Sequence, residues 1–196
     1  MKFQHALALA LLIATSLPAQ AQPAGTRIEV ITAPSASADD YRPELATAFP
    51  QSRLVGKTRL TFWGFQVYDA RLWALPGFKA SNLSTQPFAL ELAYLRTFDN
   101  LDIAVRSIAE MRRTAPVSDA QAKVWIDEMV RVIPNVKAGD RVMGIHRPGG
   151  GVQFLVNGAP SGEIRDADFA RLFFGIWLSP KTSEPKMRQA LLAGVQ

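Results

Sequence analysis

Cysteine is absent from the 196 residues of the sequence, and histidine occurs only at His5 and His146. A chain without cysteine forms no disulfide bonds, so its stability must come from a packed core. A zinc site usually needs several His or Cys ligands, and the carboxylates of this chain show no characteristic metal-binding spacing. We therefore expect no bound metal ion and no other cofactor.

Motifs of several common functional classes are also absent. His146 has no nucleophile elbow of the Gly-x-Ser-x-Gly type to serve, and its place beside a glycine-rich turn favours an exposed turn histidine. Gly149-Gly150-Gly151 is followed by neither Gly-Lys-Ser/Thr nor a helix, so we interpret it as a hairpin turn and not as a phosphate loop. Lys and Arg outnumber Asp and Glu by only 22 to 17 without forming a basic block, which does not favour nucleic-acid binding.

A compact apolar run lies near the N-terminus, and no later run is long enough and apolar enough to be a membrane span. Lys2 precedes the apolar segment 6–14, and Ala19-Gln20-Ala21 follows it. This order is typical of a secretory signal peptide. The segment is shorter than the roughly 20 residues that cross a bilayer, which disfavours the alternative of an uncleaved anchor. We predict cleavage after Ala21 and a periplasmic location.

The rest of the chain divides into two parts. Residues 22–50 are rich in Pro, Ser, Ala and Asp, and we interpret them as a loosely attached N-terminal arm with one strand over 27–31. Residues 51–196 have the length and the hydrophobic patterning of a single domain.

The patterning of residues 51–196 groups strands with strands and helices with helices. Alternating or aromatic-rich segments predict strands over 54–63, 65–75, 88–95, 141–147, 151–156 and 159–164. Helical periodicity predicts helices over 101–111 and 119–133, with Ser118 as N-cap of the second, and two more after the caps Asp166 and Ser183. The last three strands form a meander, and the whole indicates an α+β domain.

The end of the first strand places an arginine and a threonine on the same face. Alternation puts Arg59, Thr61 and Trp63 on one side of the strand and Leu60 and Phe62 on the other. Since helices must cover one face of the sheet, the environment of each polar group depends on which face they cover.

The second strand leaves two interpretations of Arg59. Alternation separates Tyr68 from Asp69 in that strand. A buried polar group is costly without a partner or a function. In the first interpretation, Arg59 therefore lies on the covered face and serves a functional site. In the second, it lies on the solvated face or pairs with Asp69. Spacing alone does not separate these two interpretations.

Two segments resemble the chalcone isomerase-like family. The family opens with a Gly-x-x-Arg motif, matched by Gly56 and Arg59, and an aromatic-rich strand, matched by FQVYDARLW over 65–73. It closes with a short helix, a Gly-x-x-x-Ser/Gly-Pro stretch and a final helix, matched over 173–194. The order of the elements between them also fits, and the chain is most similar to the exported bacterial branch.

The resemblance implies an open-faced β-sandwich, in which a large, curved, mostly antiparallel sheet is covered on one face by helices and encloses an apolar cleft. Plant enzymes of the family cyclise chalcones with the help of an arginine, and non-catalytic members hold a fatty acid. Arg59 matches that arginine, and Tyr68 keeps a hydroxyl where the plant enzymes have Thr. Leu172 has no polar group where they have Ser or Thr, so we do not expect authentic chalcone isomerase activity.

Three functional hypotheses follow. In the first, the protein binds a small apolar molecule with an anionic or carbonyl head group, fatty-acid-like or polyphenol-like, at Arg59, with Tyr68, Thr61 and Trp63 as further contacts. In the second, it is an isomerase (intramolecular lyase) acting on an enone or chalcone-like substrate. In the third, it is a non-catalytic envelope interaction domain. We predict that the walls of the cleft include Phe62, Trp63, Phe173 and Trp177. The alternative for each of these side chains is a place in the ordinary hydrophobic core.

Overall fold

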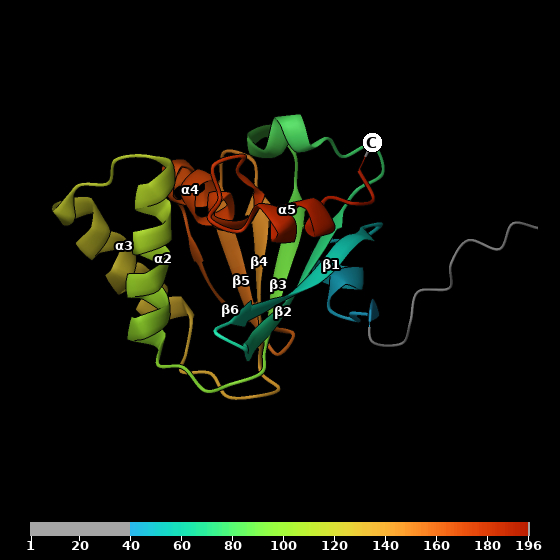
Figure 1. The fold of residues 1–196 in the computed structure, drawn as a ribbon. Helices are drawn as coiled ribbons and strands as arrows, with labels where there is room; N and C mark the ends of the chain where they lie inside the picture. The colour runs from blue at the N-terminus through green and yellow to red at the C-terminus, as the bar shows by residue number, and fades with distance from the viewer. Residues whose placement is uncertain (1–39, 196) are drawn as a thin grey trace, which may run out of the picture. The chain divides into compact units, whose positions relative to one another are not determined.

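Six antiparallel strands form one sheet in the computed structural model, which describes residues 40–195. The predicted signal peptide and the strand predicted over 27–31 lie outside the described residues. Each strand pairs with the next along the chain, so the order in the sheet equals the order in the sequence (Figure 1). The strands are β1 (Arg53–Phe62), β2 (Phe65–Ala74), β3 (Phe88–Tyr94), β4 (Arg141–Arg147), β5 (Gly151–Val156) and β6 (Ala159–Ile164).

Helices cover one face of this sheet, as Figure 1 shows. They are α2 (Asn100–Thr114), α3 (Asp119–Val132), α4 (Ala167–Leu178) and α5 (Pro185–Leu191); a short α1 (Leu45–Ala48) precedes the sheet, and a 3₁₀ segment (Ala80–Thr85) follows β2. This confirms the predicted α+β open-faced β-sandwich. None of the helices within residues 40–195 combines the length and the apolar character of a membrane span.

Local sequence signals account for where the helices α3 and α4 begin. Ser118 accepts a hydrogen bond from the Gln121 backbone N–H at 3.2 Å, and Asp166 accepts one from the Phe169 N–H at 2.9 Å. Both are N-caps, as the sequence predicted. Asp166 also accepts from the Trp125 indole at 2.9 Å and so ties α4 to α3.

The main core lies between the sheet and its helices. Alternation along β3 points Phe88, Leu90 and Leu92 at the helices, where they join buried side chains such as Phe154 of β5 and Phe169 of α4. Full burial of one such side chain stabilises the fold by about 1.5–3 kcal/mol.

The other face of the sheet is covered in part by residues 40–50. Leu45 and Phe49 are buried there against Trp73 and its apolar neighbours. The last part of the segment predicted as a loosely attached arm is therefore packed against the domain, because its apolar side chains have a second apolar surface to contact.

A buried charged cluster lies on this second face. Glu91 is fully buried and accepts hydrogen bonds from Arg42 at 2.6 and 2.7 Å and from Arg141 at 2.8 Å. Arg141 also pairs with Glu44 at 2.7 Å. Since buried charges need partners, this cluster fixes residues 40–44 on the sheet.

His146 is buried in the core, so the expectation of an exposed turn histidine was wrong. Only 5% of it is exposed, because its ring packs against the rings of Phe88 and Phe174 in the core. Its Nδ1–H donates to the Gln86 carbonyl at 2.8 Å, and its ring stacks on Phe88 at 4.8 Å between centroids.

Burial lowers the pKa of His146 below its usual 6.5, so we expect stability to fall in mild acid. The unfolded chain takes up a proton near pH 6.5, while the folded chain takes it up only at lower pH. The free energy of unfolding should therefore decrease as the pH drops below about 6.5, by at most about 1.4 kcal/mol per pH unit.

Urea unfolding between about pH 7.5 and 5.5 measures this slope. The carboxyls of Asp69 and Asp140, whose pKa values are lowered by hydrogen bonds from Arg59 and from the Lys137 backbone, titrate in stronger acid and do not contribute there. His146→Phe should remove most of the slope. Equal slopes in both proteins would contradict the prediction.

Candidate functional site

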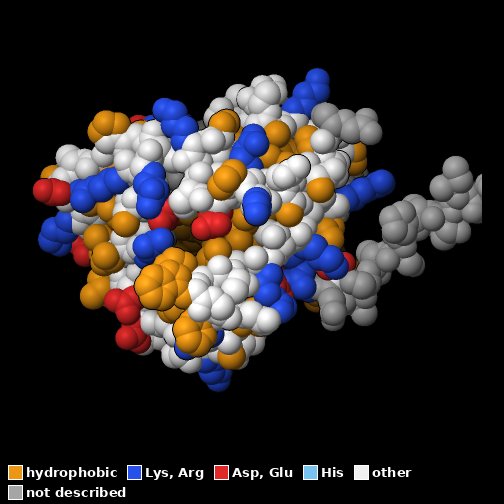
Figure 2. All heavy atoms as spheres, in the orientation of Figure 1, with side chains coloured by type: hydrophobic (Ala, Val, Ile, Leu, Met, Phe, Trp, Pro, Cys, Tyr) orange, Lys and Arg blue, Asp and Glu red, His pale blue; other side chains and the backbone are white. Residues whose placement is uncertain are grey.

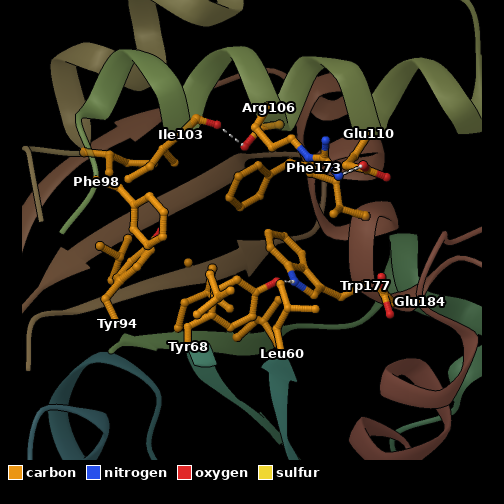
Figure 3. Close-up of a pocket in the computed structure, with 18 of the residues that line it drawn as sticks. Leu60, Tyr68, Tyr94, Phe98, Ile103, Arg106, Glu110, Phe173, Trp177 and Glu184 are labelled. Atoms are coloured by element: carbon orange, nitrogen blue, oxygen red, sulfur yellow. Dashed lines mark hydrogen bonds and ion pairs between the residues drawn. The ribbon is translucent and has the colours of Figure 1, made fainter. Parts of the chain in front are cut away.

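A cavity of about 430 Å³ lies between the helices and the helix-facing side of β1 to β5. Figure 3 shows side chains of α2 on one side of it and side chains of the strands on the other. Figure 2 shows the hollow on the surface, with hydrophobic side chains inside and charged side chains at its border. Its size and apolar lining are typical of ligand pockets. The apolar walls include Leu60, Val67, Leu90, Phe98, Ile103, Phe173 and Trp177.

Two tyrosines bring hydroxyl groups into this apolar space. Tyr68 of β2 and Trp177 of α4 point toward one another in Figure 3, and the Trp177 indole N–H donates to the Tyr68 oxygen at 2.9 Å. Tyr94 of β3 packs edge-on against Tyr68, with ring centroids 6.1 Å apart. Among residues 40–195, neither tyrosine O–H has an acceptor, so both are free to donate into the cavity.

Burial keeps both hydroxyl groups protonated. It raises the pKa of Tyr68 to about 12 and also raises the pKa of Tyr94 well above its usual value. At neutral pH, each side chain is therefore a hydrogen-bond donor and not a base. The pair can bind an oxygen acceptor on a molecule in the cavity.

The border of the cavity carries more negative than positive charge. Arg106 of α2 pairs with Glu110 at 2.8 Å, and its side chain is 68% exposed. The other charged residues that line the cavity in the described part of the chain are Asp102 and Glu184. Within residues 40–195, the cavity lining thus contains one guanidinium and three carboxylates.

Ser183 connects two sides of this border. Its hydroxyl donates to Glu110 at 2.8 Å and so joins α2 to the segment between α4 and α5. The sequence predicted Ser183 as the cap of the last helix. The N-cap position is instead occupied by the next residue, Glu184, whose side chain makes no capping hydrogen bond.

Arg59, the head-group residue implied by the resemblance, lies outside the cavity. Leu60 and Tyr68 point into the cavity, so alternation turns Arg59 and Asp69 to the other face. There Arg59 donates to Asp69 at 2.5 and 2.9 Å and to Gln66 at 2.9 Å, with 44% of its side chain exposed. The structure thus places Arg59 outside the cleft and paired with Asp69, as in the second interpretation of the sequence.

The other predicted contacts divide in the same way. Thr61 and Trp63 are exposed and do not line the cavity, whereas Tyr68 does. The sequence reasoning missed Tyr94 and Arg106. Tyr94 continues the alternation of the helix-facing side chains of β3, and this signal was available.

No group of three or more His, Asp or Glu side chains within residues 40–195 is arranged to hold a metal ion.

The fold and its interior together define an open-faced β-sandwich that encloses an apolar cavity between its sheet and its helices. The chain belongs to the chalcone isomerase-like family, since the model of that family matches residues 56–193. This confirms the resemblance seen in the sequence.

Two known proteins extend this comparison. A Haemophilus influenzae protein described as uncharacterized is 27% identical over 147 residues, which are 75% of this chain and 71% of its own length. The crystal structure of a fatty-acid binding protein from Arabidopsis thaliana matches with a TM-score of 0.54 and 11% identity, over 72% of this chain and 87% of its own. At this identity the likeness is one of fold.

Proposed function

We propose that the protein binds a small apolar molecule in the cavity and holds its polar end through the hydroxyl groups of Tyr68 and Tyr94. The observation that carries this proposal is a pair of tyrosine donors with no acceptor among residues 40–195, inside an apolar cavity. A polar group that ends in an apolar space normally has a partner, so unused donors there favour a ligand. The fatty-acid binding protein of similar fold supports an apolar ligand.

The charges at the border favour a neutral head group. A carboxylate entering there meets Asp102, Glu110 and Glu184, and Arg106, the one cation that lines the cavity within residues 40–195, is already paired. Desolvating a charge without a new partner is costly, whereas a carbonyl or protonated carboxyl oxygen only needs the tyrosine donors. We therefore favour a carbonyl head group over an anionic one.

Binding without turnover is better supported than isomerisation. An enone isomerase needs donors aimed at the oxygen that becomes negative in the transition state. The tyrosines offer such donors, but Arg59, which matches the arginine of the plant enzymes, lies outside the cavity. Export to the periplasm, inferred from residues 1–21, remains part of the proposal.

Mass spectrometry of small molecules that co-purify with the protein tests the proposal directly. A matched pair of probes tests the head group: chalcone and 1,3-diphenylpropene share one carbon skeleton, and only chalcone has a carbonyl oxygen. We expect chalcone to bind more tightly, and methyl dodecanoate to bind at least as tightly as dodecanoate at about pH 8. Tighter binding of the carboxylate would contradict the neutral head group.

Tyr94→Phe is the sharpest variant for this test. It removes a hydroxyl that bonds to no residue within 40–195, so stability should not fall. Loss of one hydrogen bond should weaken chalcone binding by about tenfold and leave 1,3-diphenylpropene unaffected. Tyr41→Phe, an exposed tyrosine elsewhere, is the control. Equal effects on the two probes, or none, would refute the assigned role of Tyr94.

A further inference from the structure

The turn between β1 and β2 carries an aromatic residue where turn chemistry disfavours one. Phe62 pairs with Phe65, and the two residues between them, Trp63 and Gly64, have φ values of 50° and 79°. Such two-residue turns favour Asn-Gly, and a bulky side chain at positive φ is strained. The same chain uses Asn157-Gly158 in the equivalent turn before β6. Trp63 therefore costs stability, which points to a role outside the fold.

Three large aromatic side chains are exposed at this turn, and we call them the tip patch. Phe62 is 55% exposed, Trp63 87% and Phe65 60%. Phe62 and Trp63 stack on each other at 6.0 Å between ring centroids. Exposed apolar groups gathered in one place mark an interaction surface.

A basic side chain accompanies the tip patch. The Arg96 guanidinium lies 4.7 Å from the centroid of the Phe65 ring. Arg96 is exposed and has no carboxylate partner among residues 40–195. Arg59 of β1 is neutralised by Asp69. An aromatic surface beside one available guanidinium suits the interface of a bilayer, where Trp sits at headgroup level and Arg attracts anionic lipid.

The tip patch is continuous with the cavity. Phe62 belongs to the patch and also lines the cavity. In Figure 2, hydrophobic side chains gather at the border of the hollow, over the end of the β1–β2 hairpin. A surface that seats the tip patch would thus meet the mouth of the cavity.

We propose that the tip patch docks on a lipid bilayer with Trp63 in the interface. The mouth of the cavity then faces the membrane, and its apolar ligand passes between lipid and protein; this second part rests on the proposed function. Three partly exposed side chains fall well short of the roughly 800 Å² per partner that a stable protein interface buries, which disfavours a second copy or another protein as the occupant.

Tryptophan fluorescence with vesicles tests the docking. Trp63 is 87% exposed, whereas Trp73, Trp125 and Trp177 are 3 to 6% exposed, so a change on mixing reports on Trp63. With vesicles of phosphatidylethanolamine and phosphatidylglycerol we expect a blue shift, quenching by brominated lipid, and co-sedimentation of the protein.

Trp63→Asn restores the favoured Asn-Gly turn, so the variant should fold at least as stably as the wild type. We expect it to lower partitioning into vesicles at least tenfold, while Tyr41→Ser, which removes a 68% exposed aromatic residue elsewhere, leaves partitioning unchanged. Arg96→Gln should weaken binding to the anionic vesicles and not to phosphatidylcholine vesicles.

Three results would overturn the docking: no blue shift in the wild type, equal partitioning of Trp63→Asn, or a self-association that Trp63→Asn abolishes. Chalcone affinity of the wild type in vesicle-free solution is measured separately. Failure there rejects the proposed function and leaves the docking intact, whereas failure with vesicles alone rejects the docking.

Discussion

Replacing Glu91 by Gln should lower the free energy of unfolding by about 3–5 kcal/mol, the largest effect we expect from a single substitution. Glu91 is fully buried, and its carboxylate neutralises Arg42 and Arg141 through hydrogen bonds of 2.6 to 2.8 Å. Arg71 lies 3.8 Å away. The amide would leave these guanidinium groups without their shared countercharge.

Urea unfolding followed by tryptophan fluorescence measures this effect. Asp127→Asn is the matched control, because Asp127 pairs with Lys123 at 2.8 Å on the exposed side of α3, where an ion pair contributes little. A loss of less than about 1 kcal/mol in Glu91→Gln would show that the cluster is hydrated or rearranges easily.

Gly56→Ala should destabilise the fold by about 1–3 kcal/mol through overpacking. A Cβ atom at this position would lie 2.2 Å from the Ala190 backbone oxygen and 2.5 Å from that of Leu191. Both atoms belong to the main chain of the last helical turn, so neither can rotate away. The glycine of the Gly-x-x-Arg motif thus allows α5 to contact β1 closely.

We expect no loss of stability from Gly175→Ala, a glycine of the closing segment that matches the family. The nearest atom to its added Cβ is the Ser179 Cβ at 3.7 Å, an ordinary contact inside α4. Alanine there should leave stability unchanged or raise it by up to about 1 kcal/mol. Thermal unfolding of both variants decides the point, and equal losses would contradict the steric explanation of Gly56.

Features set by neighbouring residues could be predicted from the sequence. Alternation correctly put Tyr68 and Asp69 on opposite faces of the sheet. Ser118 and Asp166 are the N-caps of their helices, and Asn157-Gly158 forms a two-residue turn, as predicted. Each depends on local backbone geometry, which few residues determine.

Features set by the covering of the sheet could not be predicted in this way. Alternation correctly put the side chains of Arg59 and Leu60 on opposite faces of the sheet. It does not determine which of these two side chains points toward the helices. His146 next to a glycine-rich turn has the local signature of a surface residue, and only the packing of Phe88 and Gln86 around it explains its burial.

The charged cluster on the second face also sets where the folding unit begins. The family match starts at Gly56, yet Glu91 and Arg141 find partners in Arg42 and Glu44, upstream of that match. Homology to the family thus understates the domain by at least a dozen residues. A protein truncated at the start of the match would lack Arg42 and Glu44, which pair with Glu91 and Arg141 of the sheet. It would also expose the apolar second face of the sheet to water.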